Sequence, residues 1–564
     1  MDQLILLLAA LPAAAALIVY LLNGNLGRRG VARISLVCNG LAFITAVTLL
    51  SMSISGDPVS QHGLVDAQGK GWGSLLFDPL SVLMSVVIAG ISFIVHLYSV
   101  RYMAEESGYA RFFILLDVMT SALLVMVAAG DLITLLVAWH IIGVVLYFLL
   151  GHDTRSETAY RYAFWTMLTY RIGDLPLILA AILLFQAFDS WSLTVIFRGF
   201  AENPGITTIF GLPLSEVSGS LVAFAAYARS AQFLVHTWLP YTMGGPTPVS
   251  ALMHAGIVNA GGFLINRFAP VYIHTDGVLH WIFIVGLFTA VIGSVLMLTQ
   301  NDIKKSLGYS TMGQMGFMIM ECGVGAFSLA IYHLIAHGLF KGTLFLGAGG
   351  VINEARQSDN VPKDDLYTFI VEREPARMRQ PWLLMAAITL AVPIFVFVLA
   401  HWLVAGDLFQ KQGAIILLFF GWVTGAQLLF STYRMRTQNM WRLIAMIAFS
   451  FTIVVVGYTV ISHVFDLFLY PDPAMRNQIY QAAGIDFYWF LVIIGIVTVV
   501  IVLGWLLAYY SERRQVNVNT ESGRLWLNFY ALISREFYII DLYSWFSTML
   551  LTFARRLNAW LRWV

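Results

Sequence analysis

Residues 224–266 read FAAYARSAQFLVHTWLPYTMGGPTPVSALMHAGIVNAGGFLIN, and this stretch decides the fold. It places Arg229 and His254 inside apolar segments, where a charge is costly unless it is paired or hydrated. Between them, Pro240 and Pro248 cannot continue a regular helix. Broken helices at membrane depth are tolerated only where the backbone faces protein or a water-filled cavity. The stretch therefore predicts a hydrated polar centre between two helices.

The composition places the whole chain in a membrane. Of its 564 residues, 59% are hydrophobic and 11% are charged, far outside the range of soluble domains. We expect an all-α polytopic membrane protein of about 14–16 transmembrane helices. The candidate spans are approximately 4–22, 33–54, 77–99, 111–129, 131–151, 162–187, 219–241, 248–272, 277–299, 306–325, 327–352, 381–406, 413–431, 441–465 and 488–511.

Several classes of protein are disfavoured by what the sequence lacks. Cys38 and Cys322 fall within apolar segments, so neither a disulfide framework nor a zinc motif is predicted. A net charge of +1 suggests no nucleic-acid partner. We find no Walker A, Rossmann, haem or iron–sulfur pattern, so no cofactor is expected. The remaining function is ion movement driven by a gradient or by a partner.

The loops between the candidate spans alternate in charge, which predicts the topology. Basic residues follow the odd-numbered spans and acidic residues mainly follow the even-numbered ones, so the positive-inside rule places the N-terminus outside. The outward set includes Asp57, Asp189, Glu321 and Asp472. The first segment, 4–22, lacks a basic leader and is interpreted as a retained helix.

A second group of ionisable residues lies in the segment IYHLIAHGLFKG. His333, His337 and Lys341 recur every fourth residue, so they share one helix face. Together with His254 they are candidates for a proton path, because histidine titrates near physiological pH and a desolvated lysine can lose its proton. The spacing indicates a hydrogen-bonded relay; the alternative is that each histidine bonds a backbone carbonyl. No cysteine or carboxylate lies beside them in sequence, so no metal site is predicted.

Further candidates lie in other apolar segments. Asp174 and Arg171, three residues apart, can form an ion pair on one helix. His140 has no charged neighbour in sequence and is either a proton carrier or a core histidine. Arg229 stays protonated, so it would tune neighbouring charges or hold a carboxylate on another helix. His401 follows a helix-breaking proline and completes the candidate path.

The remaining ionisable groups within or beside the spans have simpler interpretations. His96, Asp117 and His236 are expected to be structural. Lys304 and Lys305 lie at a cytoplasmic helix end, where anchoring explains them.

Two regions outside the candidate spans offer contacts with a partner or with the membrane surface. The mixed-charge loop 353–380 is either a dock for a soluble partner or a solvated connector. Residues 537–553 predict an amphipathic helix along the cytoplasmic interface, with Trp545 and Trp560 as anchors. The alternative for that stretch is a sixteenth span packed against a partner subunit.

The motifs HLYSVRYM, GYARFF, YRIGD, DIKKSLGYSTMGQMGFM and IYHLIAHGLFKGTLFL, with the stretch around Arg229, closely resemble the antiporter-like subunits of respiratory complex I and of multisubunit sodium/proton antiporters. The resemblance covers roughly residues 77–393. It implies two inverted five-helix repeats, each with a broken helix, in a chain divided into 1–110, 111–272, 273–432 and 433–564. The breaks are expected near Arg229 to Pro240 and near Pro393.

The chain departs from this family at three charged positions. His140 replaces the family glutamate that follows Trp139, and the family lysines fall on Arg229 and His401. The glutamate–lysine pair implied for coupling in the pumping relatives is therefore absent. The positions that match the family pattern are Asp174, His254, His333, His337 and Lys341.

A branch of this architecture without a long lateral helix is the DabB family, the membrane subunits of the DAB inorganic-carbon accumulation complex, and the chain resembles it most. This resemblance implies a large cytoplasmic zinc-binding DabA-like partner, no catalysis in the chain itself, and a bacterial inner-membrane location. The implied function is cation conduction, with protons expected, coupled to bicarbonate accumulation. The alternatives are a proton-pumping subunit of a complex I-like oxidoreductase or multisubunit Na⁺/H⁺ antiporter, and a scaffold without an ion path.

Overall fold

The computed structural model describes residues 2–22, 24–56, 60–62, 71–242, 245–300, 302–357, 460–484 and 531–562, with isolated residues elsewhere. A two-stranded antiparallel ribbon pairs β1 (Ser60–His62) with β2 (Leu75–Phe77). The helices are α1 (Asp2–Leu22), α2 (Arg28–Ile54), α3 (Pro79–Tyr102), α4 (Tyr109–Ala128), α5 (Leu132–Leu150), α6 (Glu157–Phe188), α7 (Leu193–Glu202), α8 (Leu214–Arg229), α9 (Thr247–Ala255), η2 (Ile257–Asn259), α10 (Ala260–Arg267), α11 (Ala269–Tyr272), α12 (Val278–Leu298), α13 (Ile303–Gly323), α14 (Phe327–Gln357), α19 (Pro473–Ala482), η3 (Glu536–Tyr538) and α22 (Ile539–Leu561).

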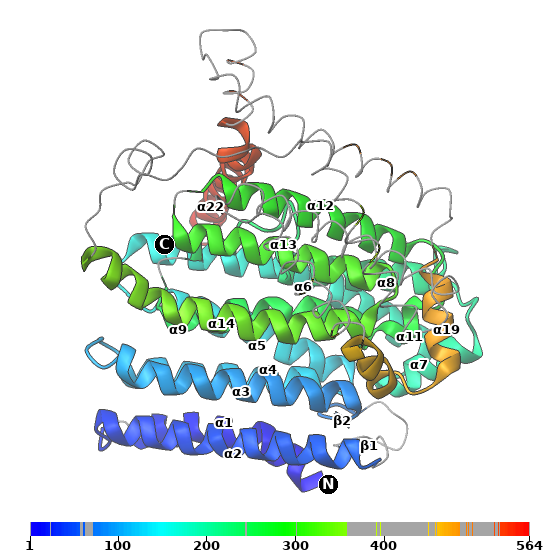
Figure 1. Cartoon of the computed structure of the whole chain (residues 1–564), viewed down its shortest axis with the longest axis horizontal. Helices are drawn as coiled ribbons and strands as arrows, with labels where there is room; N and C mark the ends of the chain where they lie inside the picture. The colour runs from blue at the N-terminus through cyan, green and yellow to red at the C-terminus, as the bar shows by residue number, and fades with distance from the viewer. Residues whose placement is uncertain are drawn as a thin grey trace.

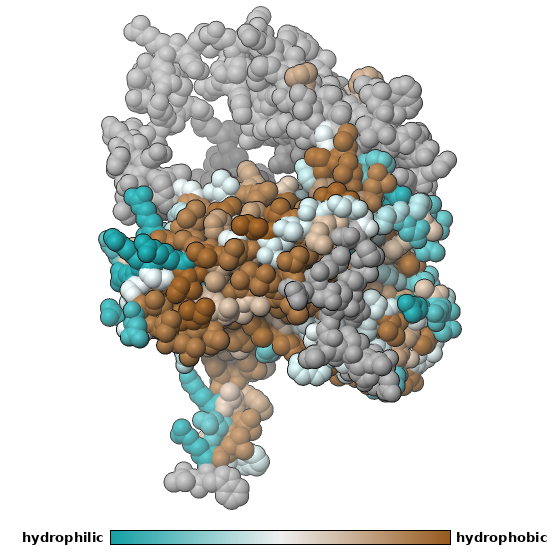
Figure 2. Space-filling model, turned by 90° about the horizontal axis from the view of Figure 1, so that it is seen from below, coloured by the Kyte–Doolittle hydropathy of each residue, from teal (hydrophilic) through white to brown (hydrophobic). Residues whose placement is uncertain are grey.

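The long helices lie side by side in one bundle, with α1 and α2 at one edge and α12 and α13 toward the other (Figure 1). Within the described ranges, ten helical segments are long and apolar enough to cross a membrane. Figure 2 shows apolar residues across the middle of one face and hydrophilic residues gathered at its ends. This distribution is that of a membrane bundle whose helices run between two polar surfaces.

Helix starts are set by short polar side chains at several loop ends. The Asp131 carboxylate accepts a hydrogen bond from the Thr134 amide at 2.7 Å and begins α5. The Asp302 carboxylate accepts from the Lys305 amide at 2.8 Å and begins α13. Each cap satisfies an amide that has no partner inside its own helix, so these ends are local consequences of sequence.

Glycines allow the close helix contacts on which the bundle depends. A Cβ added at Gly316 of α13 would lie 2.4 Å from the Ala290 amide nitrogen of α12. A Cβ added at Gly173 of α6 would lie 2.5 Å from the Cβ of Ala228 on α8. Small residues at such crossings are the usual means by which membrane helices pack closely.

The predicted break after Arg229 is present. Helix α8 ends at Arg229, and regular helix resumes only with α9 at Thr247. A second interruption, the short η2 turn, follows Gly256 and separates α9 from α10. The segment Thr247–Arg267 is 94% buried, so the discontinuous helix occupies the centre of the bundle. The second expected break, near Pro393, lies outside the described residues.

The C-terminal helix α22 extends away from the bundle (Figure 2). It carries hydrophilic residues along one side and apolar residues along the other, as the sequence predicts for residues 537–553. Trp545 and Trp560 are 63% and 79% exposed. The helix is therefore amphipathic, and its site of membrane or partner contact stays a prediction.

Candidate functional site

The broken segment between α8 and α9 is held by hydrogen bonds that replace those of a regular helix. The Trp238 indole donates to the Ala228 carbonyl at 3.0 Å, and the Ser230 hydroxyl donates to the Val258 carbonyl at 2.7 Å. Ala231 and Leu234 take positive φ values of 48° and 75°. Non-glycine residues adopt this conformation at a cost, so the surrounding contacts must hold the break in place.

Arg229 lies at the C-terminus of α8 and is almost completely buried. Its Nη2 lies 2.5 Å from the Trp139 carbonyl oxygen and 3.5 Å from Asp174 Oδ1. The guanidinium carbon lies 4.5 Å from the centroid of the Trp139 ring and 4.0 Å from that of Tyr170. A carboxylate, two aromatic faces and a helix C-terminus together stabilise the buried cation.

Two further basic side chains contact Asp174. Arg171 Nη2 lies 2.9 Å from Asp174 Oδ2, as their spacing on one helix predicts. His140 Nδ1 lies 3.5 Å from the same oxygen and also contacts the Arg171 guanidinium. Gly143 makes room for this contact, because a Cβ there would lie 2.6 Å from Arg171 Nη2. His140, which has no charged neighbour in sequence, therefore has two in space.

Helices α9 and α14 lie between α3 and α13 in Figure 1. A second polar group gathers where these two helices meet α13. His254 Nδ1 lies 3.1 Å from Thr311 Oγ1, and its ring stacks on Phe345 with centroids 4.2 Å apart. Lys341 Nζ lies 3.5 Å from the Leu307 carbonyl oxygen. Both His254 and Lys341 are 2% exposed. The histidine and the lysine thus approach α13 from two different helices.

His333 and His337 continue this group along α14. His333 Nδ1 lies 3.0 Å from Glu321 Oε2, and His333 Nε2 lies 2.9 Å from Gln314 Oε1. The His333 and His337 rings have centroids 6.3 Å apart. Among the described residues, the buried ring nitrogens of His337 contact no hydrogen-bond partner.

The single-face placement on α14 is present, and among the described residues no hydrogen bond joins His333, His337 and Lys341 directly. Side chains four residues apart on a helix are close enough to bond, but here the His333 and His337 rings have centroids 6.3 Å apart. Instead α13 supplies the partners: Leu307, Thr311, Gln314 and Glu321. The charge pattern of the loops predicts an outward loop position for Glu321, whereas this residue is buried in α13. A carboxylate inside the apolar run GFMIMECG was the available signal.

The C-terminal tail reaches the broken segment through one buried carboxylate. Lys305 Nζ lies 2.7 Å from Glu536 Oε1, and the Tyr241 hydroxyl donates to that oxygen at 2.7 Å. Farther along, the Tyr543 hydroxyl donates to the Leu234 carbonyl at 2.6 Å. Anchoring at a helix end is therefore an incomplete account of Lys305, because it pairs with a residue 231 positions later in the chain.

Two of the remaining predictions concern His401 and metal binding. His401 lies outside the described residues. Within the part of the chain that the structure describes, no three His, Cys, Asp or Glu side chains gather as metal ligands.

Family models match most of the bundle. The model described as "NADH:quinone oxidoreductase/Mrp antiporter, TM" matches residues 129–426, and that described as "NADH-Ubiquinone oxidoreductase (complex I), chain 5 N-terminus" matches residues 73–113. The chain is 57% identical over 558 residues to the "Probable inorganic carbon transporter subunit DabB1" of Halothiobacillus neapolitanus, covering 99% of each chain. It is 34% identical to NAD(P)H-quinone oxidoreductase chain 5 of Synechocystis, covering 62% of this chain and 53% of the relative.

Two solved structures share the fold at low sequence identity. A chain of the membrane-bound sulfane sulfur reductase, an archaeal respiratory membrane complex, is 18% identical with a TM-score of 0.59, covering 86% of this chain and all of that one. A chain of the Mrp complex from Dietzia sp. DQ12-45-1b is 20% identical with a TM-score of 0.55, covering 99% of this chain and 62% of that one.

Proposed function

The chain belongs to the antiporter-like membrane-subunit family of NADH:quinone oxidoreductases and Mrp antiporters, and from this membership we propose that it conducts protons to drive inorganic carbon accumulation. The coarser function, a cation-conducting membrane subunit, follows from the family. That protons are the cation, and that bicarbonate accumulation is the work done, are proposals. The similarity to DabB1 over the full length of both chains supports the second.

The convergence of buried titratable groups at α9, α13 and α14 carries the proposal. His254 and Lys341 face α13 from two helices, and His337 and His333 extend the line along α14. Neutral imidazole accepts a proton on one nitrogen and gives one up from the other, so a ring can pass a proton on. Within the described part of the chain the ring nitrogens of His337 have no hydrogen-bond partner, so we assign to His337 the step at which water bridges its neighbours.

The Asp174 group has a different part in the proposal. Arg171 and Arg229 outnumber the single carboxylate, so this group holds excess positive charge even with His140 neutral. A proton arriving at His140 is therefore repelled unless the Asp174 contacts rearrange. We assign Arg229, Arg171 and Asp174 to setting the local charge, and His140 and His401 to the path with the α14 group.

Flux measurements on the full-length chain in liposomes test the path. An inward proton gradient is imposed and the internal pH is followed with a trapped dye. His337→Gln and Lys341→Met should each lower proton flux about tenfold or more, because each removes a carrier while keeping a similar volume. His280→Gln is the matched control, since His280 bonds the Gly484 carbonyl away from this line. Normal flux in both path variants would refute the proposal.

The identity of the partner subunit distinguishes two roles for this chain, the use of a proton gradient and the pumping of protons. We propose a large cytoplasmic zinc-binding DabA-like subunit that performs the chemistry while this chain supplies the gradient. The alternative role, proton pumping in a complex I-like oxidoreductase or multisubunit antiporter, is supported by the 34% identity to the Synechocystis relative. Purification of the tagged full-length chain from its own membranes separates the two. A zinc protein in fixed stoichiometry supports the first role, and quinone-reductase subunits support the second.

A scaffold without an ion path is the third possibility, and the replacement of the family glutamate by His140 favours it. It predicts that alanine at His254, His337 or Lys341 leaves carbon-dependent growth intact. Loss of growth with normal assembly would exclude it.

A further inference from the structure

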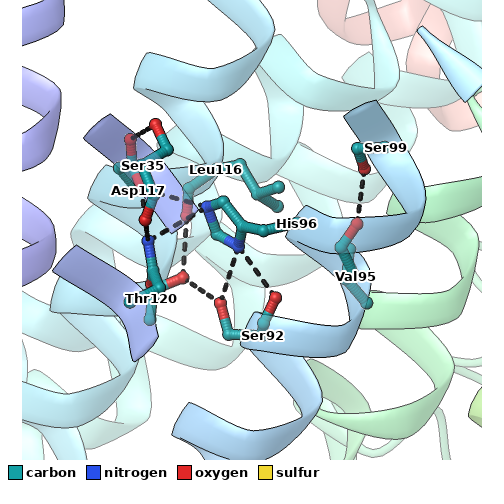
Figure 3. Close-up of polar contacts among 9 residues, drawn as sticks. Ser35, Ser92, Val95, His96, Ser99, Leu116, Asp117 and Thr120 are labelled. Atoms are coloured by element: carbon teal, nitrogen blue, oxygen red, sulfur yellow. Dashed lines mark hydrogen bonds and ion pairs between the residues drawn. The ribbon is translucent and has the colours of Figure 1, made fainter. Parts of the chain in front are cut away.

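A buried polar cluster lies outside the two groups described above, where α2, α3 and α4 meet (Figure 3). His96 of α3 and Asp117 of α4 form an ion pair with Nε2 and Oδ1 3.0 Å apart, and both side chains are completely buried. Ser35 and Asn39 of α2 complete the cluster from the third helix. Sequence analysis interpreted His96 and Asp117 as structural, and Asp117 lies between the residues that the two family models match.

Counting donors shows how many protons the pair holds. The two amide hydrogens of Asn39 go to the Ser35 carbonyl at 2.9 Å and to Asp117 Oδ1 at 2.6 Å. The Ser35 hydroxyl donates to Asp117 Oδ2 at 2.6 Å. Asn39 Nδ2 also lies 3.3 Å from His96 Nε2, but its two hydrogens go to the two shorter contacts. The 3.0 Å contact between Nε2 and Oδ1 therefore needs one proton of its own. Without it, two lone pairs would face each other in a buried site.

On the Nδ1 side of the His96 imidazole lie two hydroxyl groups, those of Ser92 and Thr120. His96 Nδ1 lies 2.8 Å from the Ser92 carbonyl oxygen and 3.2 Å from the Ser92 hydroxyl, so Nδ1 carries a hydrogen. The Ser92 and Thr120 hydroxyls are 2.5 Å apart, and Thr120 donates to the Leu116 carbonyl at 2.9 Å. Thr120 has thus used its hydrogen, and Ser92 must donate to it. The donors on this side of the ring therefore run in one order, from His96 to Ser92 to Thr120.

We propose that the His96–Asp117 pair is a further proton-binding site, which releases its proton through Ser92 and Thr120. In the release step the Nδ1–H bond breaks and a new O–H bond forms at Ser92, which passes its own proton to Thr120. Thr120 turns its original hydrogen away from the Leu116 carbonyl and gives it up to a water molecule, so each hydroxyl ends with one hydrogen. His96 is left neutral with hydrogen on Nε2, and Asp117 remains a carboxylate until the next proton arrives. The inference rests on the proposed function for the identity of the cation.

The position of the pair suits proton uptake from one membrane surface and release toward the interior of the bundle, because Ser92 lies four residues farther than His96 from the end of α3. His96 is six residues before the end of α3 at Tyr102, a rise of about 9 Å, and Arg101 marks that end as cytoplasmic in the predicted topology. Phe113 packs on the His96 ring with centroids 6.0 Å apart. The other titratable side chain near the pair, among the described residues, is the partly buried Cys38 of α2.

Serine and histidine also join membrane helices without carrying protons, and the test must separate these roles. Asp117→Asn keeps the shape and can still bond a neutral His96, so a purely structural pair should tolerate it. Infrared difference spectra between acidic and basic pH are recorded on the full-length chain in liposomes. The wild type should show imidazole bands that His96→Gln removes, together with a change in a carboxylate band that Asp117→Asn removes. Identical wild-type and Asp117→Asn spectra would overturn the proposal.

Proton flux provides the second readout. Asp117→Asn should lower flux about tenfold. Ser121→Ala, on the same helix as Asp117, removes only a bond to the Ala9 carbonyl of α1 and should not lower it. If Asp117→Asn fails to fold, Ser92→Ala keeps the pair and its infrared signal but should still slow flux about threefold or more. Unchanged flux in either folded variant would overturn the proposal. A wild-type chain without proton flux would instead refute the proposed function, and the spectra would still decide the pair.

Discussion

Replacing Asp174 by asparagine should destabilise the bundle chiefly through Arg229. Unit charges 3.5 Å apart attract by about 5 kcal/mol at an effective dielectric constant of about 20, and removing one member of a buried pair typically costs about 3–5 kcal/mol. Arg229 would keep the Trp139 carbonyl and two aromatic faces, which lowers the expected loss to about 2–4 kcal/mol. Arg171 is partly exposed, so its contribution should be below about 1 kcal/mol.

A double-mutant cycle isolates this pair. Asp174→Asn, Arg229→Met and the double variant are unfolded in denaturing detergent, and the free energies of unfolding are compared. We expect a coupling energy of about 2 kcal/mol or more between Asp174 and Arg229, and less than about 1 kcal/mol in the parallel cycle with Arg171→Gln. A coupling below about 0.5 kcal/mol for Arg229, or a larger one for Arg171, would contradict our account of the site.

Three further predictions follow from local contacts. Gly316→Ala should lower the free energy of unfolding by about 1–3 kcal/mol because its Cβ meets the backbone of α12, whereas Gly347→Ala, with nothing within 4 Å, should be neutral or stabilising in the same denaturation assay. Lys305→Met should leave the buried tail carboxylate without its cation, and limited proteolysis should then cleave before α22 faster than in the wild type. Burial, and then the Arg111 guanidinium, lower the pKa of His152 from its usual 6.5, so the contribution of this residue to stability is present above about pH 6.5 and is lost as the pH falls. Hydrogen exchange at residues 151–156, corrected for intrinsic rates, should therefore increase from about pH 7 to about pH 5, and His152→Gln should abolish that dependence.

Most of the fold could be predicted because it depends on local properties of the chain. Apolar runs of bilayer length predict the spans, and the prolines around Pro240 predict the break that the structure has after Arg229. The exact course of the break could not be predicted. It depends on Trp238 and Ser230 bonding carbonyls of Ala228 and Val258, and the second of these contacts joins two helices.

The sequence identified most of the titratable side chains that gather here, but not Glu321 and not the contacts among them. The four-residue spacing placed His333, His337 and Lys341 on one face, and the structure agrees. That spacing could not show that Glu321 would bond His333, because the contact depends on how α13 is rotated against α14. The pairing of His96 with Asp117 could not be predicted for the same reason. These two residues are in direct contact although 21 positions and a loop separate them in sequence.

By itself, the sequence determined that this chain is a membrane bundle with a broken central helix and which of its side chains can titrate, because hydrophobic length, helix breaking and helical periodicity act between residues close in the chain. Only the tertiary structure decided that Asp174 pairs with Arg229, Glu536 with Lys305, and His96 with Asp117. Those pairings depend on helix crossing and rotation, which arise from packing between segments far apart in sequence. Charge compensation in a medium without water requires contact at a few ångströms, and only the packed bundle provides it.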